Sequence, residues 1–254
     1  KPGDVELFGK NVDTGTLWIP ANGNTFDLGV YPELDEVFGV EGSSWGSAAT
    51  KLANPNSLPT GAGRRPSFSP DENYLAIAHA SSPYVTIYKR EGDTFTKLAN
   101  PDVLPPNTGY EASFSPDGNY LAIAHVSSPF VTIYKRDGDT FTKLANPDVL
   151  PTGVGNRASF SPDGNYLAIA HKNSPFVTIY KREGDTFTKL ANPNVIPTGE
   201  GLGVSFSPDG NYLAIGLVPS PYVAIYKREG DTFTKLANPN VLPTGFGYGA
   251  SFSP

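Results

Sequence analysis

The 254-residue chain contains no cysteine and no methionine, and it has only three histidines and two tryptophans. Without cysteine, disulfide bonds and thiolate metal sites are excluded. Because an initiator methionine is also missing, we expect that Lys1 is not the translated start. No apolar run approaches the roughly 18 residues that a membrane-spanning helix requires, so insertion into a membrane is not predicted.

The balance of charge argues against a nucleic-acid partner. The formal net charge is −6 at pH 7, from 25 acidic and 19 basic side chains. Nucleic-acid binding depends on a clustered basic face, whereas the recurrent Lys-Arg pairs, such as Lys89-Arg90, stand beside an acidic residue at a predicted hairpin. We interpret these pairs as solvated strand ends.

What the sequence does contain is one unit of 46 residues, repeated almost unchanged along most of the chain. Ser-Phe-Ser-Pro begins at Ser67 and recurs every 46 residues as far as Ser251, and Lys-Leu-Ala-Asn-Pro recurs on the same period from Lys51 to Lys235. A fixed period in this range predicts an architecture of stacked units.

Each unit holds four short segments with strand character, separated by turn residues. In the first complete copy these segments are residues 67–68, 74–78, 84–89 and 94–98. Proline and aspartate mark the turn after the first segment, and Glu91-Gly92-Asp93 is typical of a tight hairpin. The third segment is rich in β-branched and aromatic residues, which favour strands.

Both faces of the predicted strands are apolar or small. Leu75 and Ile77 point to one side, whereas Tyr74, Ala76 and Ala78 point to the other. A sheet with one wet face would alternate apolar with charged residues, so each sheet is expected to pack between two like sheets. Four antiparallel strands per repeat, stacked radially, predict an all-β fold, a β-propeller of four-stranded blades.

Counting from Ser67 gives four complete blades and parts of a further, split blade. A lone fourth strand around Lys51 precedes them, and a lone first strand at residues 251–254 follows. Either the natural chain continues past Pro254 into further copies, or residues 1–50 supply the missing strands and close a five-bladed ring. Nothing before Lys51 resembles the repeated strands, so we expect continuation.

The text Ser-Pro-Asp-Gly-Asn-Tyr-Leu-Ala-Ile-Ala, which runs from Ser115 to Ala124 in one copy, resembles WD-repeat-like propellers of the YVTN type from bacterial and phage proteins. This resemblance covers residues 51–254. It implies the propeller fold but no one function, because propellers host binding, scaffolding and catalysis alike. The Trp-Asp dipeptide and the Gly-His pair of true WD repeats are absent, so their hydrogen-bonded tetrad is not carried over.

Residues 1–45 contain no copy of the unit but hold both tryptophans. Their sequence, with Pro2-Gly3, Leu17-Trp18 and residues 31–39, resembles the tail-collar segment of phage tail fibres. The chain has Leu17-Trp18 where that family usually has Trp-Leu, and it lacks the later half of the family's domain. The resemblance implies a virion structural protein. The alternative is an ordinary docking segment with a short helix at residues 32–38. We therefore divide the chain into a docking segment, residues 1–45, and a β-propeller, residues 46–254.

Comparison of the copies within the chain shows where the repeat has diverged. The two turns Ser-Pro-Asp-Gly-Asn and Lys-Arg-Glu-Gly-Asp-Thr barely change, whereas the connection into each first strand and the turn between the second and third strands vary. In an up-and-down blade both variable loops open on one rim. Loops on a rigid frame often carry binding residues, so we interpret the divergence as a sign of partner binding. The alternative explanation is neutral drift of surface loops. The predicted partner-binding rim consists of Arg64, Arg65, Tyr110, Glu111, Asn156, Arg157, Lys172, Asn173, Glu200, Leu202, Phe246 and Tyr248.

The three histidines stand at one position of successive copies, His79, His125 and His171, and the fourth copy has Leu217 there. Equivalent positions of neighbouring blades lie too far apart to share one metal ion at bonding distances of about 2 Å. We therefore expect structural histidines, with no metal and no cofactor.

A catalytic site is not predicted, so the sequence favours a protein that is not an enzyme. We expect a virion-associated structural protein, on a phage tail or particle surface, whose propeller rim binds another virion protein or a cell-surface protein or glycan within a larger assembly. One alternative is a lactonase-like hydrolase, because the mixed charges of the rim could converge at the propeller mouth. The other is a bacterial surface adhesin, with an extracellular location.

Overall fold

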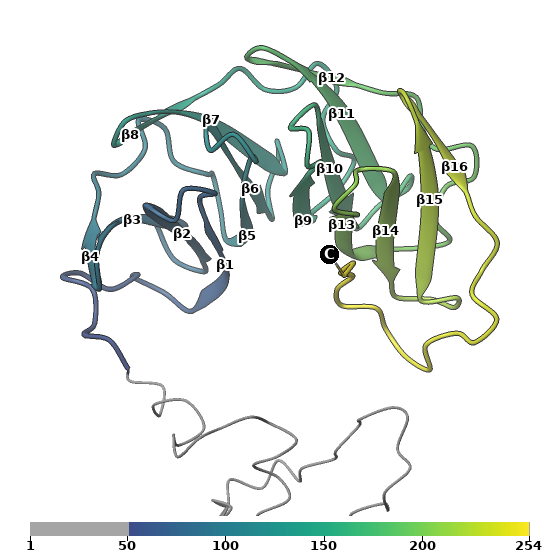
Figure 1. Cartoon of the computed structure of the whole chain (residues 1–254), viewed down its shortest axis with the longest axis horizontal. Coiled ribbons are helices and arrows are strands. Elements are labelled where there is room, and N and C mark those ends of the chain that lie inside the picture. Colours follow the sequence, from purple (N-terminus) through teal and green to yellow (C-terminus); the bar gives the residue numbers. More distant parts are fainter. Residues whose placement is uncertain (1–50, 254) are drawn as a thin grey trace, which may run out of the picture. The chain divides into compact units, whose positions relative to one another are not determined.

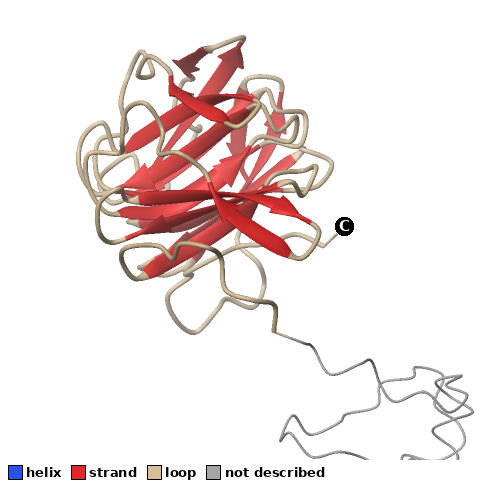
Figure 2. Ribbon diagram, turned by 90° about the vertical axis from the view of Figure 1, so that its left-hand side faces the viewer, coloured by secondary structure: helices blue, strands red, loops and turns tan. Residues whose placement is uncertain are grey.

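The computed structural model describes residues 51–253, and these residues form strands and loops without a helix (Figure 2). The strands fall into four blades of four, in agreement with the predicted β-propeller. The first blade contains β1 (Gly63–Phe68), β2 (Tyr74–His79), β3 (Val85–Glu91) and β4 (Thr94–Lys97), and the others follow at the 46-residue period. Their strands are β5 (Gly109–Phe114), β6 (Tyr120–His125), β7 (Val131–Asp137), β8 (Thr140–Lys143), β9 (Gly155–Phe160), β10 (Tyr166–His171), β11 (Val177–Glu183), β12 (Thr186–Lys189), β13 (Gly201–Phe206), β14 (Tyr212–Leu217), β15 (Val223–Glu229) and β16 (Thr232–Lys235).

Within each blade, consecutive strands pair antiparallel in the order in which they occur in the chain. The blades form an arc in which the first strands, β1, β5, β9 and β13, lie on the inner side and the fourth strands lie on the outer side (Figure 1). At the inner side β1 and β5 meet in a parallel pairing of Arg65 with Glu111. First strands of neighbouring blades are therefore adjacent, which places residues 46 positions apart next to each other.

The hydrophobic core is divided among the spaces between blades. Between the first and second blades, Tyr74, Ala76 and Ile87 of one face pack against Leu121 and Ile123 of the next. The same cluster recurs between the second and third blades and between the third and fourth. This arrangement confirms the predicted alternation, in which the leucine and isoleucine of each second strand face one neighbour and the tyrosine and alanines face the other.

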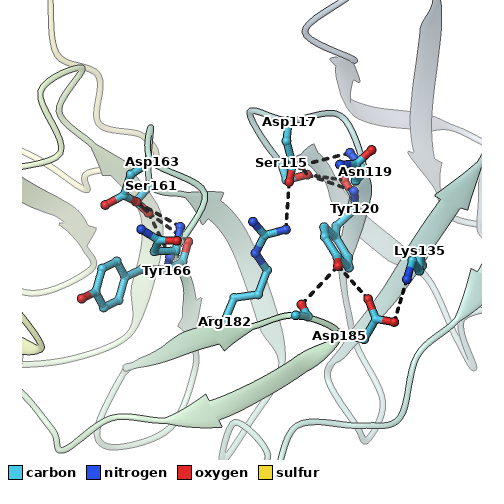
Figure 3. Close-up of polar contacts among 12 residues, drawn as sticks. Ser115, Asp117, Asn119, Tyr120, Lys135, Ser161, Asp163, Tyr166, Arg182 and Asp185 are labelled. Carbon is cyan, nitrogen blue, oxygen red and sulfur yellow. Dashed lines mark hydrogen bonds and ion pairs between the residues drawn. The ribbon is translucent and has the colours of Figure 1, made fainter.

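A polar clamp joins neighbouring blades at the hairpin between the third and fourth strands (Figure 3). Tyr120 of the second blade donates its hydroxyl to Asp185 Oδ1 of the third at 2.6 Å, and Lys135 Nζ lies 2.8 Å from Asp185 Oδ2. In the opposite direction Arg182 reaches Asp117 Oδ2 at 3.0 Å and covers the ring of Tyr120. Each clamp thus takes three side chains from one blade and two from the next.

The constancy of the Ser-Pro-Asp-Gly-Asn turn follows from its hydrogen bonds. In the second blade Ser115 Oγ bonds Asp117 and accepts the amide of Tyr120 at 2.9 Å, while Gly118 adopts a φ of 69°. A positive φ favours glycine, and Asp117 is also the acceptor of the clamp arginine. A substitution in this turn therefore disturbs both the blade and the junction with its neighbour.

The segment that was expected to be a variable loop is partly strand. The divergent residues before the first four copies of Ser-Phe-Ser-Pro belong to the innermost strands, since Gly63 already pairs with His79 and Gly109 with His125. Residues 246–250, before the fifth copy, are not in a strand. The proposed collar segment, both tryptophans and the expected helix at residues 32–38 lie outside the described residues. Among residues 51–253 no helix exists that could serve as a membrane span.

Candidate functional site

The variable positions gather at one end of the blades, as expected. At that end the turn after the second strand of each blade is hydrogen-bonded to the connection before its first strand. The amide of Ala80, after β2, donates to the carbonyl of Ala62, before β1, and Val126 donates in the same way to Thr108. The divergent side chains of the first strands, however, line the inner side of the arc. The residues predicted to form a partner-binding rim of loops are therefore found on the inner strands together with that end, and their role in binding stays a prediction.

An open pocket of about 400 Å³ lies where β1, β5 and β9 begin, and it is lined by Arg64, Arg65, Pro66, Tyr110 and Arg157. The guanidinium carbon of Arg64 lies 4.6 Å from the centre of the Tyr110 ring, a cation–π contact that orients it. Four of the five lining residues were predicted from divergence among the copies. Pro66 was missed, although it stands where the other copies have Ala112, Ala158 and Val204.

Glu111 lies beside this pocket, on the strand that carries Tyr110. Its side chain is 18% exposed, its Oε2 accepts the amide of Ala158 at 2.8 Å, and Arg157 Nε is 3.9 Å from its Oε1. Burial raises the pKa of Glu111 to about 7, against the lowering effect of the Ala158 amide and the charge of Arg65. A carboxyl group with a pKa raised this far can take up or release a proton near neutral pH.

Asn156, Glu200 and Leu202 complete the inner surface on the side of the third and fourth blades. Asn156 is buried and donates its amide to Glu200 Oε1 at 3.0 Å and to the carbonyl of Gly201 at 2.8 Å. Arg157 Nη1 donates to the carbonyl of Asn156. The bond from Asn156 to Gly201 ties β9 to β13, and the bond from Arg157 to the carbonyl of Asn156 restrains an arginine that lines the pocket and lies 3.9 Å from Glu111.

The remaining predicted residues do not line the pocket. Lys172 and Asn173 are exposed in the loop between β10 and β11, where Asn173 Nδ2 donates to the carbonyl of Thr152. Phe246 and Tyr248 are exposed in the segment after β16 and contact each other edge to face. A role for these four in binding a partner stays a prediction.

Each histidine is the last residue of the second strand of its blade, and its side chain lies in the interior. His79, His125 and His171 are fully buried, and each Nε2 lies 2.9 Å from a threonine Oγ1 of the third strand. Burial lowers their pKa, to about 4 for His125 and His171. In residues 51–253 no group of three or more His, Asp or Glu side chains is placed to hold a metal ion.

No protein-family model matches the chain, and no curated protein matches its sequence. Among solved structures, the chain is similar to a "putative 6-phosphogluconolactonase" from Bacteroides uniformis, with a TM-score of 0.58 and 20% identity, over 68% of this chain and 53% of the other. A protein of the same description from Bacteroides fragilis gives 0.55 and 16%, over 68% and 53%. The periplasmic gluconolactonase of Pseudomonas aeruginosa gives 0.55 and 22%, over 72% and 58%.

At these identities the likeness shows the β-propeller fold, and the chain spans little more than half the length of these proteins. The matches also overturn the function predicted from the sequence. They carry the names of lactonases, and nothing in the comparisons supports a phage tail-collar, a tail fibre or an adhesin. The interpretation as a virion structural protein that is not an enzyme is therefore wrong, and the lactonase-like alternative is better supported.

Proposed function

We propose that the pocket beside Glu111 is the active site of a lactonase-like hydrolase, which opens the ring ester of an anionic sugar lactone. The observation that carries this proposal is a carboxyl group with a pKa of about 7 next to a pocket lined by three arginines. A general base works best when its pKa lies near the operating pH. The names of the similar structures support the choice of a lactone as the ester.

The three arginines are suited to two tasks. Guanidinium groups bind phosphate and carboxylate through paired hydrogen bonds, so Arg64 and Arg65, which are exposed, would hold the acidic group of the substrate. Arg157 is largely buried and is anchored by Asn156. A fixed positive donor of this kind would stabilise the oxyanion that forms when the carbonyl carbon is attacked.

The bond changes are those of ester hydrolysis. A water molecule attacks the lactone carbonyl carbon while the Glu111 carboxylate accepts its proton. The tetrahedral intermediate then collapses, the bond from the carbonyl carbon to the ring oxygen breaks, and the same proton passes from Glu111 to that oxygen. The product is the open hydroxy acid, and Glu111 returns to its carboxylate form.

Glu111→Gln is expected to lower kcat/KM for lactone hydrolysis by about 100-fold, since an amide cannot accept the proton of water. The assay uses glucono-1,5-lactone and its 6-phosphate, with the spontaneous hydrolysis of each lactone subtracted at every pH. For the unaltered chain kcat/KM should rise as pH increases through about 7, because the active carboxylate form of Glu111 accumulates above its pKa. Glu91→Gln, at an exposed hairpin, is the matched control. If the unaltered chain hydrolyses neither lactone faster than buffer, the proposed activity is refuted.

Arg65→Ala is expected to raise KM for the 6-phosphorylated lactone by about tenfold and to change KM for the unphosphorylated lactone much less. The reason is that a hydrogen bond to a charged group contributes enough binding energy for such a factor. Lys51→Ala removes a positive charge from an exposed residue outside the pocket and should leave both values unchanged. Equal rises of KM for the two lactones would show that Arg65 does not recognise the phosphate.

A further inference from the structure

Glu111 lies between two arginines of the neighbouring first strands. Arg65 of β1 stands opposite it in the parallel pairing of β1 with β5, and Arg157 Nε of β9 lies 3.9 Å from its Oε1. That distance is longer than a hydrogen bond, so the contact with Arg157 is a loose ion pair. Both arginines also line the pocket, together with Arg64. The carboxyl group and an anion in the pocket would therefore share the same two positive charges.

The two oxygens of the Glu111 carboxyl group have different surroundings. Oε2 accepts the amide of Ala158 at 2.8 Å, and a protonated carboxyl group can keep this bond through its carbonyl oxygen. Oε1 is the oxygen that faces Arg157. A proton taken up by Glu111 would therefore reside on Oε1, where the resulting hydroxyl can donate a hydrogen bond to an anion held by that arginine.

We propose that Glu111 is the pocket's own competitor for anions, and that a divalent oxyanion bound by Arg65 and Arg157 brings with it the uptake of a proton at Glu111. The ligand class is a phosphate monoester or free phosphate, because guanidinium groups bind these oxyanions through paired hydrogen bonds. Two further negative charges beside a carboxylate favour its neutral form, and the Glu111 pKa of about 7 places this change near neutral pH. Assigning the arginines to an acidic ligand group rests on the proposed function.

The other titratable groups near Glu111 do not change charge in the same range of pH. The charged residues of β1 and β9 are all arginines, which keep their charge, and Tyr110 beside Glu111 lies against the guanidinium group of Arg64. The second strands β2 and β6 also pack against β5. Their histidines, His79 and His125, are fully buried, and burial lowers the pKa of both, so they stay neutral above pH 7. The tyrosines at the start of these two strands donate their hydroxyls in the polar clamps.

Sulfate is the probe for the binding test, because it keeps two negative charges at every pH used, whereas phosphate changes charge near neutral pH. Its dissociation constant, measured by isothermal titration calorimetry, is expected to be about tenfold larger at pH 9 than at pH 6. By linkage, a tenfold change in the proton affinity of Glu111 on binding gives the same factor in anion affinity. At pH 7, heats measured in two buffers of different ionisation enthalpy should show proton uptake. Equal affinities at the two pH values, or no proton uptake, would overturn the proposal.

Glu111→Gln removes the competing charge and keeps the size of the side chain. The variant should bind sulfate about tenfold more tightly than the unaltered chain at pH 9, with equal affinity at pH 6 and pH 9 and no proton uptake. Glu91→Gln makes the same charge change at an exposed hairpin and should behave like the unaltered chain. Glu111→Gln that gains no affinity at pH 9, while its melting curve shows a folded protein, would contradict the competition.

Arg65→Ala locates the anion. The variant should bind sulfate about tenfold more weakly at pH 6, because it loses hydrogen bonds to a charged group. Lys51→Ala, which removes a positive charge outside the pocket, should leave the affinity unchanged. Full affinity for sulfate in Arg65→Ala would place the anion elsewhere and overturn the assignment of this pocket.

The proposed reaction gives a second readout of the same coupling. The pH dependence of kcat/KM reports the free protein, and that of kcat reports the complex with substrate. For the 6-phosphorylated lactone the rise of kcat should therefore lie at higher pH than the rise of kcat/KM, because the phosphate on Arg65 favours protonated Glu111. For the unphosphorylated lactone the two rises should coincide. Coincident rises for the phosphorylated lactone would contradict the coupling.

Inorganic phosphate and glucose 6-phosphate, compared at pH 9, distinguish the two sources of the oxyanion. Tighter binding of the ester supports a phosphate monoester as the ligand, tighter binding of the free ion supports phosphate itself, and binding of neither overturns the proposal. Sulfate binding requires no hydrolysis, so this inference and the proposed function fail separately. Lactone hydrolysis with a sulfate affinity independent of pH refutes the competition alone, whereas the expected sulfate binding without any hydrolysis refutes the active site alone.

Discussion

Ile123→Ala is expected to lower the free energy of unfolding by about 2–5 kcal/mol, the usual cost of truncating a fully buried isoleucine. Ile123 is inaccessible to solvent and packs between the first and second blades, against Ile87 and Ala76. Because stacked units depend on the contacts between neighbours, the cavity weakens two blades at once. Denaturant unfolding followed by far-UV circular dichroism measures the change.

Ile77→Ala is the matched control, because Ile77 occupies the same position of the repeat in the first blade, where its side chain is partly exposed among the described residues. The same atoms are removed, but fewer neighbours lose contacts, so the loss should be clearly smaller. Equal losses at the two positions would contradict the arrangement of the blades.

Acid is expected to destabilise the propeller through His125 and His171, by up to about 3 kcal/mol for each. Burial lowers the pKa of both histidines from 6.5 to about 4. Between these values the unfolded chain binds a proton at each position and the folded chain does not, so the free energy of unfolding falls as pH is lowered from about 6.5 to about 4. Below about 4 both states are protonated at these positions and the histidines add no further loss. Chemical unfolding at a series of pH values measures the slope.

The fourth blade supplies the control for this prediction. There Leu217 replaces the histidine and Ala224 replaces its threonine partner, and both side chains are buried. The double substitution His125→Leu and Thr132→Ala copies that pair into the second blade. The variant should lose the contribution of one histidine to the pH dependence of the free energy of unfolding between pH 6.5 and 4. An unchanged slope would show that His125 is not the group that titrates. Glu111 has a raised pKa and acts with the opposite sign between about 7 and 4.5, but it is common to both proteins and cancels in the comparison.

How far the sequence predicts the site can be seen from Arg65, Glu111 and Arg157. Divergence among copies marked all three, because in a repeated chain the positions that differ stand out against an unchanging scaffold. The sequence placed them in loops rather than on strands, since the Gly-Arg-Arg-Pro sequence of the first copy has little strand propensity. Pairing with β2 makes this segment a strand. The function predicted from the sequence failed because it depended on residues 1–45, whereas the pocket is formed by the repeats.

The sequence by itself determined the blades. Their strands, their turns and the faces that pack together are all encoded within 46 residues, because every contact in a stack of identical units repeats the contact of one unit with the next. The tertiary structure alone decided the surroundings of Glu111. It brings Arg157 within 3.9 Å of Glu111, one full repeat away, and it buries that carboxyl enough to raise its pKa to about 7. A pKa depends on solvent exposure and on neighbouring charges, and neither is fixed until the first strands of three blades lie side by side.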